Sequence, residues 1–135
     1  MAEIAYIALG SNKGDREHYL AAARAAIAEL AGSRIIAASG VEETEPVGPP
    51  GQGRYLNQML AVETGLDPET LLSELHRIES ENGRERGLRW GERTLDLDIV
   101  RFGDRRIATD DLVVPHPELP NRDFWQRELA QMRVE

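Results

Sequence analysis

The chain has 135 residues, a length typical of one domain built around one hydrophobic core. Hydrophobic residues make up 41% of it and charged residues 30%, an ordinary composition for a globular protein. Because the sequence has no cysteine, it excludes disulfides, thiolate catalysis and cysteine-bound zinc. The formal net charge of −8 argues against binding DNA or RNA through many phosphates, although a local group of cations can still hold a nucleotide.

The sequence has no run of about 18 apolar residues, and its start lacks the basic and apolar pattern of a secretory signal. We therefore expect a cytoplasmic monomer that binds small molecules and has neither a nucleic-acid partner nor a membrane partner. Internal repeats and low-complexity linkers are also missing, so residues 1–135 are predicted to form a single domain.

Two strands and a helix are predicted in the first third of the chain. The apolar run at residues 4–9 predicts a buried strand. Asp15 is placed to cap a helix that reaches about residue 31, because its apolar residues recur at helical spacing. Residues 35–43 predict a second strand, and the proline- and glycine-rich segment 46–53 predicts a loop.

The remaining elements follow a similar alternation. Residues 55–64 predict a third strand, and Asp67 followed by proline predicts the start of a helix that reaches about residue 82. After an arginine-rich loop at 83–92, residues 95–102 predict a fourth strand. The rest of the chain is expected to be irregular until a short final helix.

The order of these elements, β-α-β-β-α-β, predicts an α+β fold of the ferredoxin-like type. In that sandwich, a mainly antiparallel sheet carries two helices packed on one face. The fold serves many chemistries, so function has to be inferred from particular side chains.

The first candidate site is a pair of carboxylates on the predicted fourth strand. Asp96 and Asp98 share one face of that strand, about 7 Å apart, while the apolar residues between and around them face the core. Such a pair can bind magnesium, although two solvated aspartates on an exposed strand are the ordinary alternative. The metal interpretation is favoured by a nearby group of arginines, because an anionic phosphate chain is bound by guanidinium groups as well as by metal ions. These arginines are Arg84, Arg86, Arg89 and Arg93.

Two further groups indicate ligand binding, each with a structural alternative. Tyr55 and Asn57 share a strand face, where a ring can stack on a planar heterocycle while an amide pairs with its polar edge. Taken alone, the pair is also consistent with a tyrosine near the end of a sheet and an asparagine on its solvent-exposed face. His116 is fixed between two prolines and can meet a phosphate or serve only the loop, and Phe124 offers a second stacking face. The sequence has no P-loop motif and no recognisable nucleophile triad.

Together these motifs resemble the 6-hydroxymethyl-7,8-dihydropterin pyrophosphokinase family of the folate pathway. The run from Arg89 to Ile99, with Trp90-Gly91-Glu92-Arg93-Thr94 before the two aspartates, is specific to that family. The other matching stretches are weak singly and follow the family's order: 6–12, 44–49, 55–57, 83–88, 114–116 and 121–124.

The resemblance implies a transferase that uses ATP as co-substrate, passes its diphosphate to the pterin hydroxymethyl group and releases AMP. It implies two Mg²⁺ ions held by Asp96 and Asp98. The residues implied to bind the pterin are Gly10, Thr44, Pro46, Val47, Tyr55, Asn57 and Phe124. Those implied to bind ATP are Leu72, Arg84, Arg86, Arg93, Ile99, His116 and Arg122. The implied catalytic residues are Arg84, Trp90, Arg93, Asp96 and Asp98.

The chain departs from the family pattern near the implied ATP site. Asp111 and Val113 stand where the family commonly has arginine and threonine, and Pro117 follows the histidine. We therefore expect weaker ATP binding with catalysis retained. Two other functions remain open: a catalytically impaired pterin- or nucleotide-binding module, and an RNA-binding domain. The few aromatic residues and the negative charge argue against the RNA-binding domain.

Overall fold

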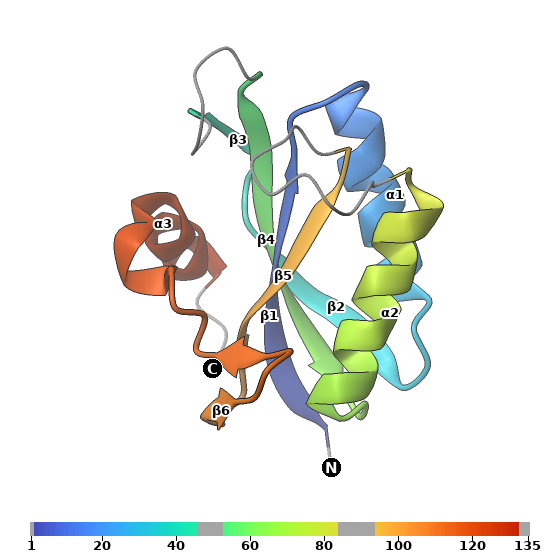
Figure 1. Ribbon diagram of the computed structural model, residues 1–135, viewed down its shortest axis with the longest axis vertical. Helices are drawn as coiled ribbons and strands as arrows, with labels where there is room; N and C mark the ends of the chain where they lie inside the picture. Colours follow the sequence, from blue (N-terminus) through green and yellow to red (C-terminus); the bar gives the residue numbers. More distant parts are fainter. Residues whose placement is uncertain (1, 46–52, 84–93, 133–135) are drawn as a thin grey trace.

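The computed structural model describes residues 2–45, 53–83 and 94–132, and within them a five-stranded sheet forms the centre of the fold (Figure 1). Its strands are β1 (Glu3–Ser11), β2 (Ser33–Ala38), β3 (Glu42–Thr44), β4 (Tyr55–Thr64) and β5 (Asp96–Phe102). The order across the sheet is β2-β4-β1-β5, with β3 also paired to β4, and each of these pairs is antiparallel. This order confirms the predicted α+β, ferredoxin-like arrangement.

Helices α1 (Arg16–Ala28) and α2 (Pro68–Glu81) lie on one side of the sheet, and α3 (Asp123–Met132) lies on the other (Figure 1). The predicted caps are present, since the carboxylates of Asp15 and Asp67 accept hydrogen bonds from the first turns of α1 and α2. No helix in the described ranges is long and apolar enough to cross a membrane.

The alternation of side chains along the strands builds two apolar clusters. The larger one lies under α1 and α2 and includes Ile7 of β1 and Leu60 of β4, both fully buried. The smaller one lies under α3, where Met59 and Val100 pack with Trp125. The second sheet face is therefore partly covered, and the uncovered part of it carries the candidate site.

The predicted second strand at 35–43 is wrong in its continuity, because the structure divides it into β2 and β3. Ser39 stands at the break, where its hydroxyl accepts a hydrogen bond from the Met59 N–H and its own N–H donates to the Met59 carbonyl. The N–H of the next residue, Gly40, donates to the side chain of Gln131 on α3. These contacts bend the chain, so β3 pairs with the far end of β4.

The segment predicted to be irregular after β5 also contains regular structure. A small second sheet pairs β6 (Ile107–Ala108) with β7 (Val113–Val114), and the 3₁₀ helix η1 (Leu119–Asn121) precedes α3. This segment folds back so that the N–H of His116 donates to the carbonyl of Val100 on β5, at 2.9 Å. The fold-back places the histidine loop beside the two aspartates.

Candidate active site

The two aspartates lie on β5 as the strand alternation predicts. Leu97 and Ile99 are buried toward the helices, whereas Asp96 and Asp98 are half-buried on the opposite face. Between the aspartates, the N–H of Leu97 donates to Oε2 of Glu79 on α2, at 2.8 Å. This carboxylate is 1% exposed, so α2 holds the outer edge of β5 from inside the protein.

Sequence reasoning missed Glu79. The sequence does contain one indication of its burial: Glu79 follows Leu75 by four residues and so lies on the apolar side of α2. A pattern of that kind shows that a carboxylate turns inward, but it does not show which backbone group it meets. Only the packing of α2 on β5 identifies the partner.

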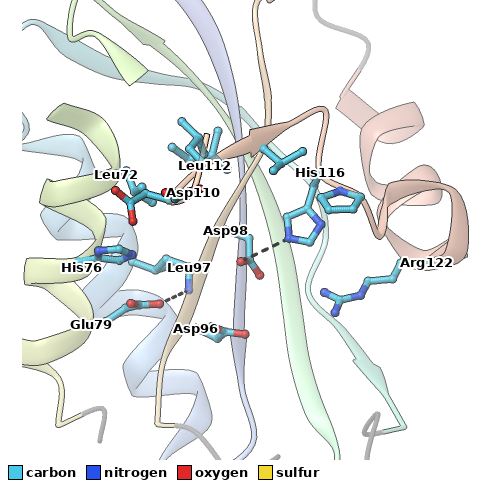
Figure 2. A pocket seen from close by; sticks show the side chains of 14 residues that line it. Leu72, His76, Glu79, Asp96, Leu97, Asp98, Asp110, Leu112, His116 and Arg122 are labelled. Carbon is cyan, nitrogen blue, oxygen red and sulfur yellow. Dashed lines mark hydrogen bonds and ion pairs between the residues drawn. The ribbon is translucent and has the colours of Figure 1, made fainter. Parts of the chain in front are cut away.

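A cleft of about 440 Å³ opens beside the aspartates, between α2, β5, the turn at 110–113 and the histidine loop (Figure 2). Its walls bring together side chains that are up to 50 residues apart in the sequence. The residues predicted for metal or ATP binding that line it are Leu72, Asp96, Asp98, Ile99, His116 and Arg122.

His116 is held in one orientation. Its Nδ1 accepts a hydrogen bond from the N–H of Glu118, at 3.0 Å, so the neutral ring carries its proton on Nε2. Nε2 lies 3.8 Å from Oδ1 of Asp98, and the two side chains face each other in Figure 2. The ring also packs edge-on against Trp125, with centroids 4.9 Å apart. The histidine therefore presents an N–H donor to the cleft.

Arg122 approaches the same space from the start of α3. Its guanidinium carbon lies 4.4 Å from the centroid of the Trp125 ring, a cation–π contact that supports the side chain from behind. In Figure 2 the guanidinium group points toward Asp96 and Asp98. An arginine in this position can contact a phosphate that also reaches the aspartates.

The predicted pterin residues that the structure describes on the strands lie on the same sheet face as the aspartates. Gly10 on β1 stands opposite Asn57 on β4 and opposite Asp96 on β5, so these three residues form one row across three strands. A side-chain carbon at position 10 would lie 3.3 Å from Cδ1 of Tyr55 and 3.5 Å from Oδ1 of Asn57. The glycine therefore keeps this part of the face low and open.

Asn57 is oriented by β3. Its Nδ2 donates to Oγ1 of Thr44, at 2.6 Å, and Thr44 stands opposite Tyr55 in the sheet. Phe124 of α3 packs on the cluster that contains Ala8, one row further along the same face. Four predicted pterin residues thus adjoin one another, and Phe124 approaches the face from the helix above it.

Among the described residues that line the cleft, acids outnumber bases. Asp110 and Asp111 on the turn add two carboxylates to those of β5 and Glu79, and Arg122 is the arginine that these residues contribute. Carboxylates in this number favour a divalent cation beside any phosphate that binds here.

The described residues include no cluster of three histidine or acidic groups able to cage a metal. Mg²⁺ does not require such a cage, because it commonly uses one or two carboxylates together with waters and substrate phosphates. The hard oxygen donors of Asp96 and Asp98 fit that requirement, since both border the cleft.

Six predicted site residues lie outside the described residues, so the structure does not place them. They are Pro46, Val47, Arg84, Arg86, Trp90 and Arg93.

The protein is an α+β protein whose cleft is lined by carboxylates, a histidine and an arginine from among the described residues. The family described as 7,8-dihydro-6-hydroxymethylpterin-pyrophosphokinase matches residues 6–134, and the chain belongs to this family. That membership confirms the resemblance found in the sequence.

Similar proteins cover almost the whole chain. A protein named 2-amino-4-hydroxy-6-hydroxymethyldihydropteridine pyrophosphokinase from Bacillus subtilis is 46% identical over 132 residues, which cover 98% of this chain and 79% of that protein. Proteins of the same name from Haemophilus influenzae and Pseudomonas aeruginosa are 46% and 41% identical. Their matches cover 89% and 98% of this chain, and 75% and 82% of the respective relatives.

Proposed function

We propose that this protein transfers the diphosphate group of ATP to the hydroxymethyl group of 6-hydroxymethyl-7,8-dihydropterin and releases AMP. The observation that carries the proposal is the row Asn57–Gly10–Asp96. It joins a surface suited to a pterin edge to carboxylates suited to a metal-bound phosphate. Membership in the pyrophosphokinase family supports the same reaction.

On the nucleotide side, the cleft receives ATP between α2 and the histidine loop. Leu72 and Ile99 supply apolar contacts for the nucleoside, and His116 and Arg122 donate to phosphate oxygens. Asp96 and Asp98 would hold two Mg²⁺ ions. Such ions would neutralise the phosphate charge and favour loss of the proton from the attacking hydroxyl.

On the pterin side, the ring lies on the face between Tyr55 and Phe124. The amide of Asn57 pairs with its polar edge, with Thr44 holding the amide in place. The pterin hydroxyl oxygen then forms a bond to the β-phosphorus, the bond from that phosphorus to the oxygen of AMP breaks, and the hydroxyl proton leaves to solvent. The protein's contribution is positioning and charge stabilisation, with no covalent intermediate.

The six residues outside the described ranges keep their predicted roles in this proposal. Pro46 and Val47 contact the pterin, while Arg84, Arg86 and Arg93 bind phosphates. Arg84, Trp90 and Arg93 also remain the predicted catalytic residues of this group. The monomeric state and the cytoplasmic location also remain predictions.

The decisive experiment is one incubation with ATP, Mg²⁺ and the reduced hydroxymethyl pterin, followed by separation of the nucleotides and pterins. We expect AMP and pterin diphosphate in equal amounts, with none in the matched Asp98→Asn variant. Binding of both ligands without AMP would instead identify the catalytically impaired binding module, and ADP as the product would contradict diphosphate transfer.

A further inference from the structure

Glu128 is a fully buried acid that the proposed reaction does not use. It lies on α3 with 0% exposure, and among the described residues no hydrogen-bond donor reaches either carboxylate oxygen. On this helix it follows Phe124 by four residues and Trp125 by three, so it shares their inward side. Burying an ionised carboxyl without a hydrogen-bond donor costs free energy, so the protonation state of Glu128 has to be considered.

The surroundings of Glu128 favour the protonated acid. Burial, and secondly the nearby carboxylate of Glu42 on β3, raise the pKa of Glu128 to about 8, while Arg127 acts in the opposite direction. Arg127 itself bridges to Glu42 at 2.7 Å and to Asp123 at 3.2 Å. A proton on Glu128 supplies the donor that is otherwise missing, and Glu42 is the acceptor.

Among the described residues, the other elements packed against α3 contribute mainly apolar groups to this place. β4 and η1 contribute Met59 and Leu119 to the apolar cluster, and β1 contributes Tyr6. The β2–β3 connection contributes the N–H of Gly40, which donates to Gln131 of α3 at 3.0 Å. In the part of the chain that the structure describes, Glu42 and Arg127 are thus the charged groups that act on Glu128.

The acceptor Glu42 is itself part of the proposed pterin site's framework. It stands opposite Asn57 in the β3–β4 pair, two residues before Thr44, which accepts from the Asn57 amide. Phe124 lies one helical turn from Glu128. A bond between Glu128 and Glu42 therefore joins the helix that carries Phe124 to the strand that orients Asn57.

We propose that Glu128 is a positioning residue whose protonated carboxyl joins α3 to β3 at Glu42 and so places Phe124 over the pterin face. This role rests on the proposed function, because the Glu128–Glu42 bond can affect pterin affinity only if the protein binds a pterin. When Glu128 loses its proton, two carboxylates meet in an apolar place, and α3 moves away from β3.

The test measures affinity for 6-hydroxymethyl-7,8-dihydropterin from pH 6.5 to 9.5 at constant ionic strength, with saturating Mg²⁺ and a non-hydrolysable ATP analogue. If the ionised form does not bind the pterin, the Kd of the unmodified protein rises about 30-fold at pH 9.5 relative to its low-pH value. Glu128→Gln keeps the size and the donor but cannot ionise, so it lacks this additional rise. Asp123→Asn, which removes an exposed carboxylate of the same helix, serves as the matched control and follows the unmodified protein.

A second variant separates positioning from burial. Glu128→Leu removes both the charge and the donor, so at pH 7 it binds the pterin several-fold more weakly than Glu128→Gln, with unchanged affinity for the ATP analogue. Equal pterin affinities of these two variants, or parallel pH profiles of Glu128→Gln and the unmodified protein, would overturn the proposal.

Tryptophan fluorescence without any ligand tests this inference separately from the proposed function. Trp125 is 2% exposed, and in a Trp90→Phe background it is the remaining tryptophan of the chain. Its emission shifts to the red above pH 8 if α3 is released, and Glu128→Gln abolishes that shift. Failure of all variants to bind the pterin would refute the proposed function, whereas a pH-independent Trp125 emission would refute the α3 bond itself.

Discussion

Replacing Glu128 by glutamine should stabilise the protein at neutral pH and remove much of the pH dependence of its stability. The pKa of this acid is raised from 4.5 to about 8 in the folded protein, mainly by burial. Glutamine has nearly the same shape and retains a donor for Glu42, so the substitution removes the ionisation and leaves the packing almost unchanged.

The size of the effect follows from the shift in pKa. Below pH 4.5 the acid is protonated in both the folded and the unfolded chain, and its contribution to stability is fully present. As the pH rises, the unfolded chain loses this proton while the folded chain keeps it, so stability falls by about 1.4 kcal/mol per pH unit. The loss reaches about 3 kcal/mol at pH 7 and levels off once the pH has passed the folded pKa.

The assay is urea denaturation of both proteins at pH 5, 6, 7 and 8, followed by circular dichroism. The free energy of unfolding of Glu128→Gln minus that of the unmodified protein should grow by about 3.5 kcal/mol from pH 5 to pH 8. In Asp123→Asn, which alters an exposed carboxylate, the corresponding difference should stay nearly constant. A constant difference for Glu128→Gln would show that this acid is ionised in the folded state, and the reasoning would be refuted.

Three further predictions concern the proposed active site. Asp96→Asn and Asp98→Asn should each lower AMP formation at least about 100-fold with an unchanged circular dichroism spectrum, because both side chains lie outside the apolar core; near-normal turnover at limiting Mg²⁺ would refute the metal assignment. Asn57→Ala should weaken pterin binding by about 1–3 kcal/mol in a calorimetric titration while ATP binding alone stays the same; equal losses for both ligands would indicate a folding defect. Asp111→Arg replaces a carboxylate of the cleft lining by a cation, so it should tighten ATP binding several-fold at low salt and less at high salt; unchanged or weaker binding at low salt would show that this position does not act on the phosphates.

Local pattern alone determined several features of this protein. The alternation along residues 95–99 placed Asp96 and Asp98 on one face, because consecutive side chains of a strand must point in opposite directions. Asp15 and Asp67 were recognisable as helix caps because the need of a helix start for an acceptor is also local. The order of the elements, and the run that resembles the pyrophosphokinase family, were likewise readable along the chain.

Contacts between distant segments determined what local pattern could not. The break of the second strand depends on the hydroxyl of Ser39 meeting the N–H of Met59, 20 residues away. The orientation of His116 depends on its loop folding back onto β5. Glu79 and Glu128 are buried helix carboxylates, and the groups that they meet are visible only once the helices are packed.

The physical reason is that periodicity reports which side of an element turns inward, but not which group lies opposite it. For Glu79 the opposite group is a backbone N–H, which donates a hydrogen bond to the carboxylate. For Glu128 it is another carboxylate, so the proton has to stay. The same residue type thus meets two different partners, and only the packing of α2 on β5 and of α3 on β3 decides which one.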